Sequence, residues 1–152
     1  GYVHAIAHQF GGRYHTPHGL ANAIVLPHVL RYSLPDITDR LAALAVRARL
    51  GDDSEREDLL AQKFIDGVVA LERDIGIPTH LAALKEADIP NLARAACHEA
   101  HTGYPVPRYL TQQGCEDLIR LVLPPADPGR RAAKPAAKKT SARKPRGSTT
   151  SN

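Results

Sequence analysis

The chain has 152 residues, 43% of them hydrophobic, which is enough to bury the core of one ordinary domain. Residues 124–152 contain eight Lys or Arg and one Asp, a net charge of +7, so residues 1–123 carry −3 of the total of +4, and the folded part is not basic. Two cysteines are too few for a disulfide framework, so a reducing, cytoplasmic compartment is predicted. No run of 18 apolar residues is present to form a membrane helix, so no membrane contact is predicted.

The amino-terminal segment is predicted to be a short helix followed by a turn. Residues 1–9 read as a helix that places His4 and His8 on one face, because they are four residues apart. Gly11, Gly12 and Pro17 then predict a turn over residues 11–17.

Two further helices are predicted on either side of residue 33. Residues 18–32 form the first, and Pro27 inside it is expected to kink or restart the helix. Residues 33–36, Ser-Leu-Pro-Asp, are a helix-capping signature with proline in the first turn, so the second helix is expected to start there and to stop at Gly51.

A fourth helix is predicted from the capping box at residues 54–57 to Gly76 and Pro78. Its expected buried stripe has helical spacing and consists of Leu60, Phe64, Val68, Leu71 and Ile75.

The remaining elements are short helices over residues 81–85, 89–101 and 111–123. No run of four residues alternates like a strand, so the predicted fold class is all-α. Residues 124–152 consist mainly of Ala, Lys, Arg, Pro and Ser and cannot bury enough surface to offset the entropy of ordering. We therefore predict a helical domain over residues 1–123 and a disordered basic tail over residues 124–152.

Histidines are concentrated near the amino terminus. Five of the eight fall in the first 28 residues: His4, His8, His15, His18 and His28. Imidazole is a common ligand of Fe, Zn, Cu and Ni, and four histidines within 15 residues favour a metal site about as strongly as they favour ordinary surface histidines. A zinc protease is excluded, because Ala5 stands where its helix requires Glu. His28, His80, His98 and His101 are read as ordinary helix or loop residues.

Residues 4–29 also resemble a known signature. They match every fixed position of the pattern H-x-x-A-H-x-x-G-G-x-x-x-x-P-H-G-x-x-N-A-x-x-L-P-H-V, which is similar to that of the iron-containing, or group III, alcohol dehydrogenases. Segments 76–79, 88–90 and 105–108 resemble later parts of that family. The resemblance covers residues 1–123 and leaves out the tail.

The resemblance implies the carboxyl-terminal helical, metal-binding domain of the dehydroquinate synthase-like fold. In that family a divalent metal, Fe(II) or sometimes Zn(II), is held by one Asp and three His. His4 and His18 match two of those ligands, and His8 matches a histidine near the nicotinamide ring, here the expected catalytic and cofactor-binding residue. The other ligands and the nucleotide-binding domain lie upstream in the family, so the chain, which starts directly before the motif, is expected to be a fragment that is inactive alone.

The function that this resemblance implies is hydride transfer between a small primary alcohol or aldehyde and NAD or NADP, in an enzyme that is a homo-oligomer when complete. Two alternatives remain: an inactive remnant, and a helical module whose basic tail contacts nucleic acid. For the tail itself, a solvated extension without a function is favoured over nucleic-acid binding. Geometrically, the Gly11-Gly12 turn and Pro17 are expected to bring His18 back to His4, with His8 beside them. The isolated chain is expected to expose apolar surface near its first helix, and therefore to be marginally stable or to self-associate.

Overall fold

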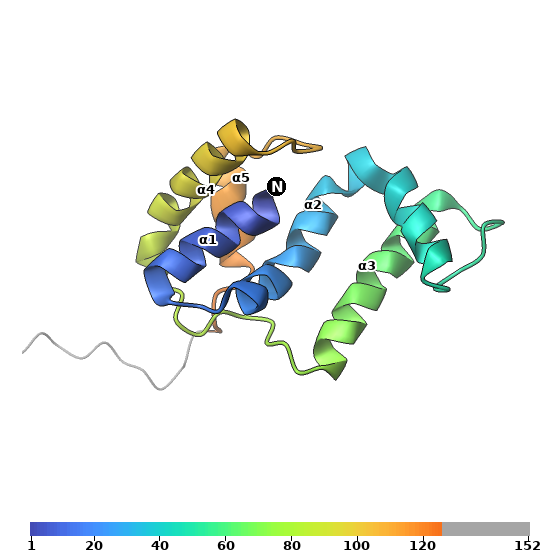
Figure 1. Ribbon diagram of the computed structural model, residues 1–152, viewed down its shortest axis with the longest axis horizontal. Coiled ribbons are helices and arrows are strands. Elements are labelled where there is room, and N and C mark those ends of the chain that lie inside the picture. Colours follow the sequence, from blue (N-terminus) through green and yellow to red (C-terminus); the bar gives the residue numbers. More distant parts are fainter. Residues whose placement is uncertain (126–152) are drawn as a thin grey trace, which may run out of the picture.

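The computed structural model describes residues 1–125, which form five α-helices and a single 3₁₀ turn, without a strand in that range. The prediction of an all-α domain is confirmed. Figure 1 shows α1 lying between α2 and the α4–α5 pair, while α3 packs along the second half of α2. The predicted disorder of the basic tail concerns residues that lie almost entirely outside the described range.

Helix α1 (Tyr2–Tyr14) runs straight through the two glycines that were predicted to form a turn. Each glycine costs the helix about 1 kcal/mol relative to alanine, whereas burying Phe10 contributes about 1.5–3 kcal/mol. Because Phe10 is completely buried, packing outweighs the glycine preference. The chain instead reverses at His15, whose φ of 55° is left-handed, and at Pro17, which precedes the next helix.

Helix α2 (His18–Arg47) joins the two helices that were predicted separately. The predicted kink at Pro27 is wrong, whereas the predicted start of a second helix at Ser33 falls four residues before the observed break, since the backbone leaves helical geometry at Ile37 (φ −138°, ψ 19°). Pro35, which lacks an amide hydrogen, lies two residues before this break.

Helix α3 (Glu57–Asp74) buries only the first half of the predicted stripe. Leu60 is buried, but Leu71 and Ile75 are 60% and 65% exposed. Ala61 and Ile65 are also buried, in a cluster with Leu41 that Leu30, Leu34 and Ile37 of α2 flank. The second half of α3 instead faces the first half of α2 across a pocket, which Ile24 and Arg31 line on one side and Val69 and Glu72 on the other.

The carboxyl-terminal elements are η1 (Glu86–Asp88), α4 (Ile89–Gly103) and α5 (Gln112–Arg120). The helix expected over residues 81–85 is a turn instead. The start of α5 is as predicted, because the Thr111 hydroxyl caps it by accepting the amide hydrogen of Gly114 at 3.0 Å.

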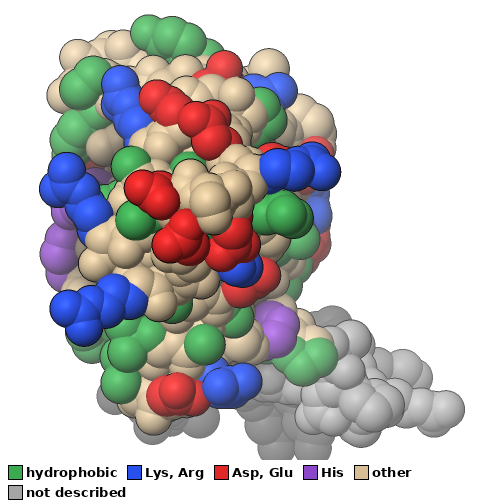
Figure 2. All heavy atoms as spheres, turned by 90° about the vertical axis from the view of Figure 1, so that its right-hand side faces the viewer, with side chains coloured by type: hydrophobic (Ala, Val, Ile, Leu, Met, Phe, Trp, Pro, Cys, Tyr) green, Lys and Arg blue, Asp and Glu red, His purple; other side chains and the backbone are tan. Residues whose placement is uncertain are grey.

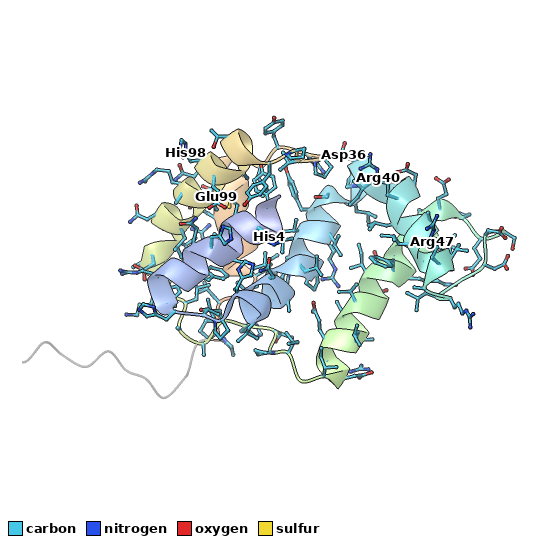
Figure 3. All side chains as sticks on the ribbon, viewed as in Figure 1. His4, Asp36, Arg40, Arg47, His98 and Glu99 are labelled. Atoms are coloured by element: carbon cyan, nitrogen blue, oxygen red, sulfur yellow. The ribbon has the colours of Figure 1, made fainter. Side chains whose placement is uncertain are left out.

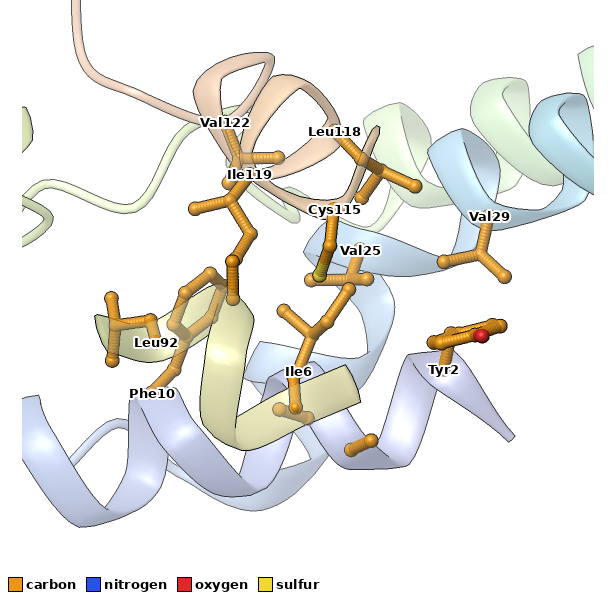
Figure 4. Close-up of a cluster of buried hydrophobic side chains, with 14 of the residues drawn as sticks. Tyr2, Ile6, Phe10, Val25, Val29, Leu92, Cys115, Leu118, Ile119 and Val122 are labelled. Atoms are coloured by element: carbon orange, nitrogen blue, oxygen red, sulfur yellow. The ribbon is translucent and has the colours of Figure 1, made fainter. Parts of the chain in front are cut away.

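The main core lies between α1, the first half of α2, α4 and α5 (Figure 4). Its largest completely buried side chains include Ile6, Phe10, Ile89 and Ile119. Cys97 and Cys115 are free thiols in this core, and burial raises the pKa of both, so neither is a ready nucleophile. None of the helices described over residues 1–125 is long and apolar enough to cross a membrane.

Candidate metal and hydride-transfer site

Three histidines come together on one face of the molecule. His4 and His8 stand one turn apart on α1, and His18 is the first residue of α2. The ring centroids of His4 and His18 are 5.3 Å apart, those of His8 and His18 are 5.2 Å apart, and those of His4 and His8 are 6.1 Å apart. The expected convergence of the three rings is therefore present, although the turn that produces it is at residues 15–17 rather than at the two glycines.

The spacing of His4 and His18 suits two ligands of one metal ion. With metal–nitrogen bonds of about 2.0–2.1 Å, two imidazole centroids in a tetrahedral shell lie about 5 Å apart. The 5.3 Å between His4 and His18 matches this separation, as does the 5.2 Å between His8 and His18, so the motif rather than the spacing distinguishes His4 from His8. Over residues 1–125, no group of three or more His, Cys, Asp or Glu side chains is arranged to hold a metal ion. The described residues thus offer two imidazoles at a spacing that a metal ion would accept, but not a complete set of ligands.

Asn22 sets the hydrogen-bonding state of His18. Its amide nitrogen donates to the His18 carbonyl oxygen at 2.8 Å and lies 3.0 Å from Nε2 of the same histidine. Because that nitrogen is a donor, Nε2 of His18 is the unprotonated acceptor of the ring, and its lone pair is directed at the Asn22 amide. The Asn22 Oδ1 atom is buried without a hydrogen-bond partner among the described residues, so an unused acceptor lies beside the histidines.

His8 has a different partner from the other two rings. Its Nδ1 lies 2.7 Å from a carboxylate oxygen of Glu99, which comes from α4. Figure 3 shows Glu99 above α1, on the same side of the molecule as His4. Glu99 could not be predicted from the sequence, because 91 residues separate it from His8 and no spacing rule connects them.

A largely apolar groove of about 720 Å³ begins beside the cluster. His4 and His18 form one end of it, and Leu26, Leu30 and Ile37 of α2 line the rest. Apolar side chains therefore border the imidazoles on one side, while His4, His8 and His18 themselves are exposed.

The other histidines lie away from this cluster. His28 and His80 line a separate pocket against Arg31, where burial and nearby positive charge lower the pKa of His28. His101 accepts or donates a 2.6 Å hydrogen bond with the hydroxyl of Tyr2, which itself accepts the amide hydrogen of Leu110. Their interpretation as ordinary helix and loop residues is consistent with these contacts.

Comparisons with known proteins agree with the geometry. The family model described as "Fe-containing alcohol dehydrogenase family, C-terminal" matches residues 1–123. The chain is 41% identical over 124 residues to 1,3-propanediol dehydrogenase of Klebsiella pneumoniae, covering 79% of this chain and 31% of that protein. It is 38% identical over 123 residues to lactaldehyde reductase of Escherichia coli (strain K12), covering 80% of this chain and 31% of that protein.

Solved structures give the same result for the fold. The crystal structure of 1,3-propanediol oxidoreductase superimposes with a TM-score of 0.76 and 38% identity, covering 81% of this chain and 32% of that one. Alcohol dehydrogenase from Oenococcus oeni gives a TM-score of 0.73 and 31% identity, covering 80% of this chain and 32% of that one. The chain thus spans about a third of the length of the relatives that it matches.

Proposed function

Because this chain belongs to the iron-containing alcohol dehydrogenase family and corresponds to its carboxyl-terminal domain, we propose that it supplies the metal-binding part of an NAD- or NADP-dependent enzyme. The enzyme would transfer a hydride between a small primary alcohol or aldehyde and the nicotinamide. The observation that carries this proposal is the 5.3 Å separation of the His4 and His18 rings, beside an apolar groove.

In this proposal His4 and His18 hold Fe(II), with Zn(II) as the alternative. Neutral imidazoles suit both ions and leave the metal electrophilic. When bound, the metal supplies Lewis acidity toward the hydroxyl of the alcohol. The remaining ligands and the nucleotide-binding residues come from a part of the enzyme outside this chain, which spans 31% of its relatives' length.

In the same proposal His8 has the catalytic and cofactor-facing role. Oxidation of an alcohol would need a hydride acceptor, which a bound nicotinamide would supply, and a separate group to accept the hydroxyl proton. The position of His8, one turn from His4 and stacked near His18, supports its assignment as that proton acceptor, beside the nicotinamide. A cytoplasmic location and a homo-oligomeric complete enzyme are parts of the same proposal.

Metal binding by the 152-residue chain tests the ligand assignment directly. Titration with Co(II), followed by its visible absorption, should show weak, reversible binding, because the chain supplies only two of the four ligands. His4→Ala and His18→Ala should each abolish it, while His8→Ala should retain it. His98→Ala, which removes an exposed histidine of α4, is the matched control. Unchanged binding in His18→Ala would refute the assignment.

A chimera tests the activity. Residues 1–123 would replace the corresponding carboxyl-terminal region of the Klebsiella pneumoniae 1,3-propanediol dehydrogenase, and oxidation of 1,3-propanediol with NAD would be measured. We expect an active enzyme in which His8→Ala keeps its metal and lowers kcat by about 10²–10⁴-fold. An inactive chimera that is folded and metal-loaded would favour the alternative of an inactive remnant.

A further inference from the structure

The carboxylate of Glu99 joins α1 to α4 beside the histidine cluster. One oxygen lies 2.7 Å from Nδ1 of His8 and accepts the Tyr104 hydroxyl at 3.3 Å, and the other accepts the side-chain amide of Gln9 at 3.1 Å. Donors on three sides, from α1 and from the residue that follows α4, therefore fix the direction in which this carboxylate points.

This arrangement determines which nitrogen of His8 carries a hydrogen. An ionised carboxylate only accepts hydrogen bonds, so Nδ1 of His8 must be the donor. In the neutral ring Nε2 then holds the free lone pair. Since Nδ1 and Nε2 stand on different edges of the ring, Nε2 is directed away from Glu99, and the ring itself stacks against His18 at 5.2 Å.

A contribution to folding stability is a poor explanation for the several hydrogen bonds that the Glu99 carboxylate makes. The side chains of His8 and Glu99 are 43% and 29% exposed, and an ion pair that is this open to solvent contributes little to folding. Orientation, by contrast, benefits from every additional donor, because each one removes a rotamer of Glu99 that would release His8.

We propose that Glu99 is a positioning residue for His8. It holds His8 in the form with Nδ1 protonated and Nε2 free, so that the nitrogen available to accept a proton is the one that Glu99 does not occupy. This inference rests on the proposed function only where Nε2 accepts the proton of the alcohol. The tautomer of His8 is a property of this chain and can be tested without that function.

The tautomer is measurable in the 152-residue chain by ¹⁵N NMR of its histidine side chains, assigned with His8→Gln and recorded at an alkaline pH where imidazole is neutral. In the native chain, His8 should carry its hydrogen on Nδ1. In Glu99→Gln, the signal should shift toward the form protonated on Nε2, and Glu99→Asp should restore it in part. Glu116→Gln, which removes a carboxylate paired with Arg120 on α5, should leave it unchanged. Nε2 protonation in the native chain, or no shift in Glu99→Gln, would overturn the proposal.

Two further measurements separate positioning from stability and from the proposed function. Tyr104→Phe removes one donor and keeps Glu99, so it should give a smaller shift of the tautomer even if Glu99→Gln fails to fold. Co(II) binding should be unchanged in Glu99→Gln, and in the chimera kcat should fall at least tenfold with little change in KM. A loss of kcat that Glu116→Gln reproduces would overturn positioning. Full activity of His8→Ala would instead refute the role of His8 while leaving the tautomer result intact.

Discussion

The molecule has two regions that are packed to different degrees. In the body, α1, the first half of α2, α4 and α5 share one large core, whereas the hairpin of the second half of α2 with α3 has two small clusters of three buried residues each. The hairpin also carries exposed large side chains, namely Leu44, Leu59, Leu71 and Ile75. Figure 2 shows that end, where hydrophobic side chains lie among acidic and basic ones. The histidine cluster lies on α1 and at the start of α2, in the well-packed body, so its geometry should not depend on the hairpin.

The largest effect should come from cutting a cavity in the body. Phe10 is completely buried under α4 and α5 (Figure 4), and Phe10→Ala should cost about 3–5 kcal/mol of folding free energy. Because Phe10 is on the helix that carries His4 and His8, Co(II) binding should weaken as well. Urea denaturation measures the first effect. Leu71→Ala, in the exposed part of the hairpin, should stay within about 0.5 kcal/mol of the native chain, and a comparable loss there would contradict the comparison.

A cavity in the hairpin should have a more local effect. Ile65 is completely buried between α2 and α3, and Ile65→Ala should cost about 2–3 kcal/mol, the lower part of the usual range, because its cluster is small. Native-state hydrogen exchange should show faster exchange of α3 amides with little change in α4. Equal loss of protection in both helices would mean that the molecule unfolds as one unit.

A smaller effect is expected at the surface of the body. Arg13 and Tyr14 donate hydrogen bonds to Asp88, and they hold the pKa of this carboxyl below its ordinary value of 3.8. A lowered folded-state pKa stabilises the protein above the unfolded-state pKa, and this stabilisation is lost as pH falls through the folded value.

Asp88→Asn should therefore lower the urea midpoint at pH 7, and the difference from the native chain should shrink below about pH 4. Asp74→Asn serves as the control, since Asp74 is 65% exposed and, among residues 1–125, pairs only with its neighbour Arg73. A difference that persists unchanged at pH 3 would show that Asp88 acts through packing rather than charge.

The sequence predicted best what depends on nearby residues. His4, His8 and His18 lie within 15 residues, so a motif could place them together, and Thr111 was correctly identified at the start of α5. Local rules failed where packing outweighed them, as at the two glycines inside α1. They also could not locate Glu99, whose contact with His8 exists only because α4 docks on α1.

The hairpin of α2 and α3 is a second case in which a local sequence pattern did not predict the packing. The spacing of the α3 stripe predicted a buried face, but a periodic pattern does not reveal how far the opposing helix extends. Leu71 and Ile75 are exposed, while their neighbours Val69 and Glu72 face a pocket that α3 shares with the first half of α2. The helices were predictable from the sequence, whereas which residues of the stripe are covered depends on how the helices pack.

The short connection at residues 15–17 has a consequence for the order in which the site assembles during folding. Bringing His4 to His18 closes a loop of only 14 residues, whereas bringing His8 to Glu99 closes one of 91 residues. Loop closure costs more entropy as the loop lengthens, and contacts between distant residues form later. The contact between His4 and His18 should therefore form early, as soon as α1 and α2 fold against each other. His8 acquires its contact with Glu99 only when α4 packs on α1, so the proposed metal-binding pair should assemble before the proposed proton acceptor is oriented.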